Sequence, residues 1–403
     1  MHHLATFLLV VLTCLFGCTP PEAPTDPEDT LAVPTPDTTL PAVTFYQGVD
    51  LSYVNQILDH GGTYRDSGEV RSPYRIFKDH GANLARFRLW HQPTWTRDVY
   101  GSAGTQLYND LADVTEAIRL AKAQGMAINL DFHYSDTWTD PGKNQVPAAW
   151  RDITSLDVLA DSIYQYTYQT LQHLAQRGLM PEMVQIGNEI NCGFYFTEAP
   201  AGLPKASVCQ EPAHWQALGQ LLNAGIRAVR EVAKSTDVQP QILLHVADPK
   251  NITWWFDNVT TTGQVHDFDV LGFSFYPLWH SEGVQLENLG EHVARYKSKY
   301  HKQVMILETA YPWTTEGADS YSNIFGSGTP LAGYPFTKTG QAQLLREMTR
   351  QMRNGGGYGI IYWEPAWITS QMKDLWGTGS SWENATLFDF QGAPLPGMAY
   401  LKE

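Results

Sequence analysis

Two glutamates in this sequence stand at the ends of apolar segments, where a carboxylate could do chemistry. Residues 184–189 read Val-Gln-Ile-Gly-Asn-Glu and end in Glu189, and residues 304–308 read Val-Met-Ile-Leu-Glu and end in Glu308. Gly, Pro or aromatic residues follow both segments. This pattern is typical of a β-strand that delivers a side chain to a pocket built by loops.

Such a pair suits retaining glycoside hydrolysis, in which one carboxyl group protonates the leaving oxygen and the other, roughly 5–5.5 Å away, attacks the anomeric carbon. We predict that Glu189 is the acid and later the base, and that Glu308 is the nucleophile. The charge of Glu308 would raise the pKa of Glu189 and keep it protonated. Neither step requires a cofactor. The alternative is that each glutamate is only a structural ion-pair partner.

Strand-like segments alternate with amphipathic segments along the chain and would position this pair. The strand candidates are residues 45–51, 83–90, 126–134, 183–189, 241–246, 270–276, 304–308 and 359–363. Helical spacing of apolar residues is clear between them, for example at Leu156, Leu159, Ile163 and Leu171. Eight strand–helix units in series predict an α/β fold, a single (β/α)8 TIM barrel over residues 43–403.

Functional side chains of such a barrel lie where its strands end. The strand candidates end in polar or aromatic residues: Asp50, Arg86, Arg88, Trp90, Asp131, His133, Asp136, Trp138, Asn188, Glu189, His245, Tyr276, Glu308, Trp363 and Glu364. Arg86 and Arg88 alternate on one face of their strand, where an arginine can keep a carboxylate ionised. They could equally form a buried salt bridge with Asp50.

Composition limits the classes of function. The chain has 403 residues, of which 43% are hydrophobic and 17% charged, so it can form a large hydrophobic core. A net charge of -15 without any basic run argues against a nucleic-acid partner. Aromatic residues reach 12%, and we expect some to pack in the core and others to stack on sugars.

The N-terminus indicates export. An apolar run over residues 4–16 precedes Cys18 and has the shape of a lipoprotein-type signal over residues 1–18. Residues 19–42 are rich in Pro, Thr and acidic residues and read as an extended linker. We expect lipidation at Cys18 and anchoring at the bacterial outer membrane or cell surface. The alternative is ordinary cleavage and secretion.

Two cysteines remain once Cys14 and Cys18 are assigned to the signal. Cys192 and Cys209 flank the loop that follows Glu189. In an oxidising compartment a disulfide between them is expected, although two separate thiols would also fit.

Several longer motifs carry a resemblance to a known family. They are Gly48-Val49-Asp50-Leu51-Ser52, Arg86-Phe87-Arg88-Leu89-Trp90, Asp131-Phe132-His133-Tyr134-Ser135-Asp136-Thr137-Trp138, Gln185-Ile186-Gly187-Asn188-Glu189, Phe273-Ser274 with Tyr276-Pro277, Glu308-Thr309-Ala310-Tyr311-Pro312-Trp313, and Tyr362-Trp363-Glu364-Pro365-Ala366-Trp367. With these motifs the chain resembles glycoside hydrolase family 53, the endo-β-1,4-galactanases, over nearly all of its length after residue 42.

The resemblance implies a retaining endo-hydrolase of β-1,4-galactosidic bonds in pectic galactan. By it Glu189 is the acid/base and Glu308 the nucleophile, while Asn188 bonds the sugar 2-hydroxyl and Tyr276 orients Glu308. Trp363 would floor the subsite beside the cleaved bond. Further substrate-binding candidates are Arg88, Trp90, His133, Asp136, Trp138, His245, Trp279 and Trp313.

Other interpretations stay open from the sequence. Another retaining barrel endoglycanase, acting on mannan, xylan or cellulose, would carry the same pair of glutamates. A non-catalytic glycan-binding lipoprotein would not need a proton donor. Some members of the family bind calcium after the last strand, but residues 374–384 lack a dense run of acidic ligands. We expect a polysaccharide substrate and a monomer, with no metal required and structural calcium left open.

Overall fold

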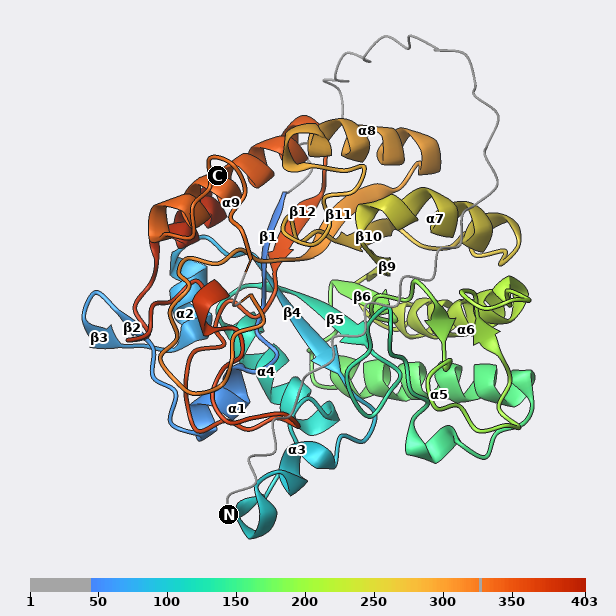
Figure 1. Cartoon of the computed structure of the whole chain (residues 1–403). Coiled ribbons are helices and arrows are strands. Elements are labelled where there is room, and N and C mark those ends of the chain that lie inside the picture. Colours follow the sequence, from blue (N-terminus) through green and yellow to red (C-terminus); the bar gives the residue numbers. More distant parts are fainter. Residues whose placement is uncertain (1–44, 326–327) are drawn as a thin grey trace, which may run out of the picture. The chain divides into compact units, whose positions relative to one another are not determined.

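The computed structural model describes residues 45–325 and 328–403, and within them eight parallel strands close into a barrel (Figure 1). The strands follow the order β1-β12-β11-β10-β9-β6-β5-β4 around it. The predicted (β/α)8 barrel is therefore confirmed. The predicted signal and linker, with Cys18, lie outside the described residues.

The barrel strands start within one residue of the predicted ones; β9 and β11 end one residue later than predicted, and the other six end one to three residues earlier. They are β1 (Tyr46–Asp50), β4 (Leu84–Leu89), β5 (Ala127–Phe132), β6 (Met183–Ile186), β9 (Gln241–Ala247), β10 (Val270–Ser274), β11 (Gln303–Thr309) and β12 (Gly359–Tyr362). Two small hairpins that the sequence did not predict pair β2 (Arg65–Asp66) with β3 (Glu69–Val70) and β7 (Gly193–Phe194) with β8 (Ala206–Ser207).

Helices fill the connections between successive barrel strands. They are α1 (Val54–Asp59), α2 (Pro73–Asp79), α3 (Trp95–Asp98), α4 (Leu111–Ala123), α5 (Leu156–Ala175), α6 (Trp215–Ala233), α7 (Ile252–Thr261), α8 (Leu289–Tyr300) and α9 (Lys338–Asn354). No helix in the described part of the chain is long and apolar enough to cross a membrane.

The last strand–helix unit departs from the prediction. After β12 the chain ends in a 3-10 helix, η6 (Pro396–Lys402), in place of an α-helix. This segment packs beneath the barrel, where the Gln47 side-chain amide donates to the carbonyl of Tyr400 at 3.0 Å. The sequence Leu-Pro-Gly at 395–397 disfavours a longer helix, because proline limits the preceding turn and glycine lowers helix propensity.

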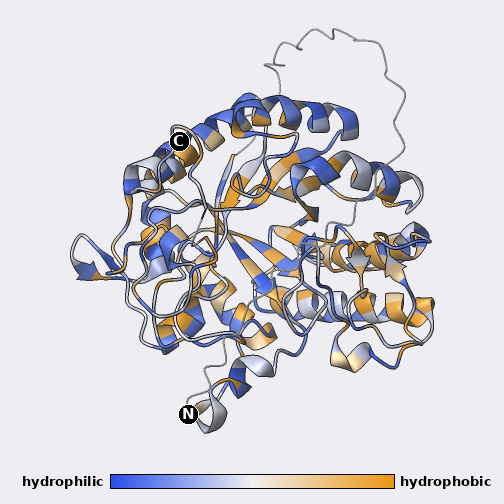
Figure 2. Ribbon diagram, in the orientation of Figure 1, coloured by the Kyte–Doolittle hydropathy of each residue, from blue (hydrophilic) through white to orange (hydrophobic). Residues whose placement is uncertain are grey.

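Successive side chains of each strand point alternately into the barrel and out toward the helices, and they form two apolar layers. The inward-facing residues of the lower barrel form their own cluster, Leu84, Met183, Leu243, Val270, Met305, Leu307, Tyr358 and Ile361. Outward-facing residues pack against the helices, such as Leu159, Ile163 and Leu171 of α5. Figure 2 shows hydrophobic residues concentrated on the barrel strands and mostly hydrophilic ones on α8. The apolar interior thus supports a polar layer at the carboxyl ends of the strands.

Candidate active site

Glu189 reaches the barrel mouth on an irregular turn after β6. The strand ends at Ile186, and both Gly187 (φ +87°) and Glu189 (φ +45°) adopt left-handed backbone conformations. A Cβ at Gly187 would lie 2.6 Å from a methyl carbon of Ile190, so only glycine fits. The predicted disulfide between Cys192 and Cys209 is present directly after this turn.

Glu308 reaches the same mouth through a bulge in β11. Met305 and Leu307 face the barrel interior, while Ile306 packs outside, so strict alternation would turn Glu308 outward. The pairing shifts by one residue here: Phe273 is opposite Ile306, but the next residue of β10 is opposite Glu308. Such a bulge re-aims the following side chain, and Glu308 consequently enters the mouth.

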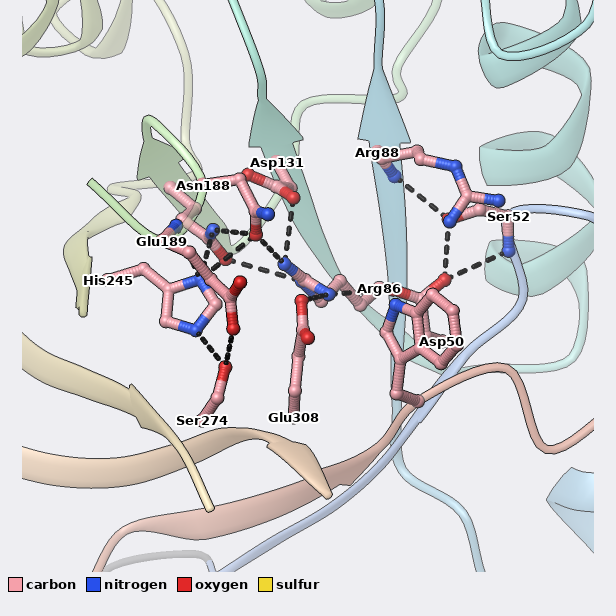
Figure 3. A network of polar contacts seen from close by, with 12 residues as sticks. Asp50, Ser52, Arg86, Arg88, Asp131, Asn188, Glu189, His245, Ser274 and Glu308 are labelled. Carbon is pink, nitrogen blue, oxygen red and sulfur yellow. Dashed lines mark hydrogen bonds and ion pairs between the residues drawn. The ribbon is translucent and has the colours of Figure 1, made fainter. Parts of the chain in front are cut away.

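Both glutamates line one cavity of about 610 Å³. Figure 3 shows their carboxyl groups at the centre of a polar network built from several strands. Of the predicted residues, Trp138, Asn188, Tyr276, Trp279 and Trp363 also line this cavity. The cavity is also lined by residues that were not predicted from the sequence, among them Tyr321, Trp367, Trp376 and Trp382. Their only sequence signal is tryptophan or tyrosine in long loops after β11 and β12.

Arg86 is the hub of the network beneath the cavity. Its Nη1 donates to Asp50 and to Glu308, each at 2.8 Å, and its Nη2 donates to Asp131 at 2.8 Å and Asn188 at 2.7 Å. Its Nε donates to Gln185 at 3.3 Å, and the side chain is 1% exposed. Three carboxylates therefore share one guanidinium, whose own pKa is raised despite its burial.

Opposing influences act on Glu308. Burial raises its pKa, while the guanidinium of Arg86 and a 2.9 Å hydrogen bond from the Tyr276 hydroxyl oppose that rise. The negative charges of Asp50 and Asp131 add to it. The pKa of Glu308 therefore lies above its ordinary value. One donor faces each of its oxygens, which favours the ionised form and orients the carboxylate for attack.

Glu189 accepts one side-chain hydrogen bond, from Ser274, and has no hydrogen bond to Arg86 among the described residues. Burial raises its pKa well above the ordinary value, and the charge of Glu308 raises it further. The Ser274 hydroxyl lies 2.5 Å from its Oε1 and acts in the other direction. A protonated acid beside an ionised carboxylate is the division of roles that glycoside hydrolysis requires.

Replacing Arg86 by Met is expected to destabilise the fold by about 3–5 kcal/mol near neutral pH, because three buried carboxylates lose their common partner. Without Arg86 the pKa values of Asp131 and Glu308 would rise in the folded state, so the loss of stability should grow with rising pH and shrink in acid. Denaturant unfolding at several pH values measures this.

The exposed Arg119, which pairs with Glu116 on the surface of α4, provides the matched control. Arg119→Met should leave the free energy of unfolding nearly unchanged, because exposed ion pairs contribute little to stability. Equal effects of the two substitutions would contradict the account of Arg86.

Three of the predicted substrate-binding residues lie beneath the cavity wall instead of lining it. Arg88 is 1% exposed, donates to Glu364 at 2.6 Å, and stacks 4.1 Å from the ring centre of Trp138. Trp90 is fully buried and donates from its indole N–H to His133 Nδ1 at 3.3 Å. These residues are placed to support Trp138, and contact of Arg88, Trp90 or His133 with substrate stays a prediction.

Three others are also absent from the cavity lining. Asp136 accepts hydrogen bonds from the backbone N–H groups of Gln92 (2.9 Å) and Ala148 (2.7 Å), a loop-holding arrangement. Trp313 is 6% exposed and donates to the Glu383 carbonyl at 3.1 Å. His245 is fully buried among the polar side chains under Glu189. These side chains form hydrogen bonds within the protein, and contact of Asp136, Trp313 or His245 with substrate stays a prediction.

The loop after β12, considered above for calcium, has its carboxylates bonded to protein donors. Asp374 accepts from the Tyr321 hydroxyl at 2.8 Å, and Glu383 accepts from the Ala318 N–H at 2.6 Å. Within residues 45–325 and 328–403, no group of three or more His, Cys, Asp or Glu side chains has a metal-binding arrangement.

Comparison with known proteins gives consistent matches. The profile of Glycosyl hydrolase family 53 matches residues 46–401. An arabinogalactan endo-β-1,4-galactanase of Cellvibrio japonicus is 43% identical over 347 residues, 86% of each chain. An endo-β-1,4-galactanase of Bacillus subtilis is 33% identical, over 88% of this chain and 84% of that protein.

Solved structures agree with this result. The catalytic domain of a family 53 hydrolase from Ignisphaera aggregans has a TM-score of 0.76 and 34% identity, over 92% of this chain and 99% of that one. Xylanase B of Clostridium stercorarium, at 14% identity and a TM-score of 0.51, shares the fold alone. Because the family profile spans nearly the whole barrel and both glutamates, this chain belongs to glycosyl hydrolase family 53.

Proposed function

We propose that the protein is an endo-β-1,4-galactanase that hydrolyses galactan with retention of configuration. The observation that carries the mechanism is the contrast between the two glutamates: Glu308 has a donor on each oxygen, one of them from Arg86, whereas Glu189 has a donor on one oxygen and a pKa that is raised more. The names of the similar proteins from Cellvibrio japonicus and Bacillus subtilis support the choice of galactan.

In the first step Glu308 attacks the anomeric carbon and the bond from this carbon to the leaving oxygen breaks. Glu189 gives its proton to that oxygen, so that the departing sugar leaves as a neutral alcohol. The glycosyl ester formed on Glu308 has no charge. The pKa of Glu189 consequently falls once its neighbour is neutral.

In the second step Glu189 acts as a base. It takes a proton from a water molecule, the water oxygen bonds to the anomeric carbon, and the bond to Glu308 breaks. Two displacements on one carbon restore the original configuration. Asn188, whose amide oxygen is held by Arg86 and whose amide nitrogen donates to the Thr139 carbonyl, presents its side chain at a fixed position beside the sugar.

The cavity walls suit a polymer of galactose. Trp279 and Trp376 line the cavity and are 49% and 64% exposed, so the cavity continues to the surface along aromatic faces. Such faces stack on the apolar C–H patches of sugars. Trp363, held edge-on by Trp382 at 4.7 Å between ring centres, stands beside the glutamates as a floor for the sugar at the cleaved bond.

The proposed substrate is tested by reducing-end release from linear β-1,4-galactan, measured beside mannan, xylan and a soluble cellulose derivative. Rapid shortening of galactan alone is expected. Cleavage of another polymer instead would mean a different endoglycanase with the same pair of glutamates. Binding without any cleavage would favour a non-catalytic glycan-binding protein.

We also propose that the protein is exported and anchored by lipid on Cys18, with residues 19–42 as a tether. The support is the apolar run that ends at Cys18 and the Pro- and Thr-rich composition that follows it. Labelling of growing cells with a tagged fatty acid should mark the protein, and Cys18→Ser should abolish the label and release the protein from the membrane.

A further inference from the structure

We propose that Ser274, oriented by His245, confines the catalytic proton of Glu189 to Oε2, the oxygen that Ser274 does not contact. Ser274 and His245 are thus positioning residues for the acid, acting through a directed chain of hydrogen bonds (Figure 3). The inference rests on the proposed function and adds the means by which one oxygen is selected.

The donors and acceptors at the Nδ1 atom of His245 decide in which direction this series of hydrogen bonds runs. The backbone N–H of Glu189 points to it at 3.3 Å and can only donate. The side-chain amide nitrogen of Gln185 lies 3.0 Å away, and this amide cannot be reversed because its oxygen accepts from Arg86 Nε. The Asn188 oxygen, also 3.0 Å away, already accepts from Arg86. With two donors facing it, Nδ1 is an acceptor and the ring hydrogen resides on Nε2.

Only one of the two ring nitrogens of His245 carries a hydrogen, because the side chain is neutral. Burial lowers its pKa well below the ordinary value, and the positive charge of Arg86 lowers it further. Asp131 acts in the opposite direction and His133 in the same direction as Arg86. The geometry at Nδ1 and the charges around the ring therefore lead to the same tautomer.

The next link is the Ser274 hydroxyl, which is fully buried. It accepts from His245 Nε2 at 2.9 Å and lies 2.5 Å from Glu189 Oε1, to which its hydrogen is donated. If the proton of Glu189 were on Oε1, two donors would point at one serine oxygen and the serine hydrogen would lose its partner. A buried donor without a partner is costly, so the carboxylic proton belongs on Oε2.

This arrangement serves both steps without moving. Oε2 gives its proton to the leaving oxygen and later takes one from water, while Oε1 keeps the hydrogen bond from Ser274 throughout. No proton passes through Ser274 or His245. Arg86, Asp140 and Glu308 are the other charged groups that act on Glu189, and none of them contacts Oε1 in the described chain.

Replacing Ser274 by Ala tests the inference. Hydrolysis of galactan, whose leaving group needs a proton, should fall about 10- to 100-fold. The first step on a dinitrophenyl β-galactobioside, which needs no proton, should be nearly unchanged. The upper limb of the kcat/KM pH profile on galactan should move to higher pH, since the ionised form of Glu189 loses a donor.

Thr309→Val is the matched control, because Thr309 is fully buried next to Glu308 and its hydroxyl has no partner among the described residues. It should alter neither the ratio between the two substrates nor the pH profile. Two variants of His245 provide a second test that does not depend on the folding of Ser274→Ala. The activity of His245→Gln on galactan should stay closer to wild type than that of His245→Leu, because glutamine retains an N–H donor.

Equal losses by Ser274→Ala on both substrates with an unmoved upper limb would overturn the inference and leave the proposed function standing. Equal behaviour of His245→Gln and His245→Leu would also overturn it. Failure of the wild-type protein to hydrolyse galactan would instead overturn the proposed function, and the inference with it.

Discussion

Glu308→Gln is expected to reduce the hydrolysis of β-1,4-galactan on the order of 10⁵-fold or more, as is seen when a nucleophile is removed. An amide cannot form the glycosyl ester, and no other carboxylate is oriented toward the cavity by both Arg86 and Tyr276 in the described chain. The folded protein should be at least as stable as wild type, because one of three buried negative charges around Arg86 is removed.

The measurement is kcat/KM on galactan, together with calorimetric binding of galacto-oligosaccharides and thermal unfolding. Glu316→Gln, an exposed position in the loop after β11, serves as the control and should behave as wild type. Retention of substantial activity by Glu308→Gln would remove Glu308 from its role. Loss of both binding and stability would indicate a structural role instead.

Glu189→Gln is expected to lower kcat/KM on galactan about 10²- to 10⁴-fold, the usual contribution of general acid catalysis. On an activated aryl galactobioside the first step should remain fast, because its leaving group departs without a proton. The second step should slow, because water has lost its base. A burst of the released phenol followed by slow turnover should therefore appear in stopped-flow measurements.

Glu198→Gln is the matched control for this prediction, since Glu198 is exposed in the same loop and bonds only Gln145 among the described residues. It should leave both substrates unaffected. Equal losses by Glu189→Gln on activated and natural substrates, without a burst, would contradict the assignment of Glu189 as the acid.

Much of this architecture could be predicted from the sequence, because the barrel strands are short apolar runs with clear ends. The strand that leads to Glu189 and the strand that contains Glu308 are buried on both faces, and each apolar run is followed directly by polar residues. The bulge in β11 could not be predicted, since the run from Val304 to Leu307 reads equally well as a regular strand. The position of Glu308 at a strand end was sufficient without it.

The roles of supporting side chains were beyond the sequence for a different reason. Arg88 and His245 stand at strand ends like the glutamates, but burial and hydrogen-bond partners place them under the cavity wall. Ser274 is a small residue inside an apolar run, and only the folded barrel brings it to Glu189. A position at a strand end predicts that a residue lies in the polar layer at the barrel mouth. Whether its side chain can contact substrate depends on tertiary contacts that the sequence does not reveal.

The retaining mechanism through Glu308 is tested most directly by trapping the intermediate. The reagent is a 2-deoxy-2-fluoro-β-galactobioside with a dinitrophenyl leaving group. Its fluorine slows both steps, but the good leaving group keeps the first step faster than the second, so the glycosyl ester accumulates. The mass of the intact protein and of its proteolytic peptides is then measured. The account predicts the addition of one galactobiosyl unit, bearing a single fluorine, on the peptide that contains Glu308. An adduct on another residue, or rapid turnover that gives the inverted anomer without any adduct, would contradict it.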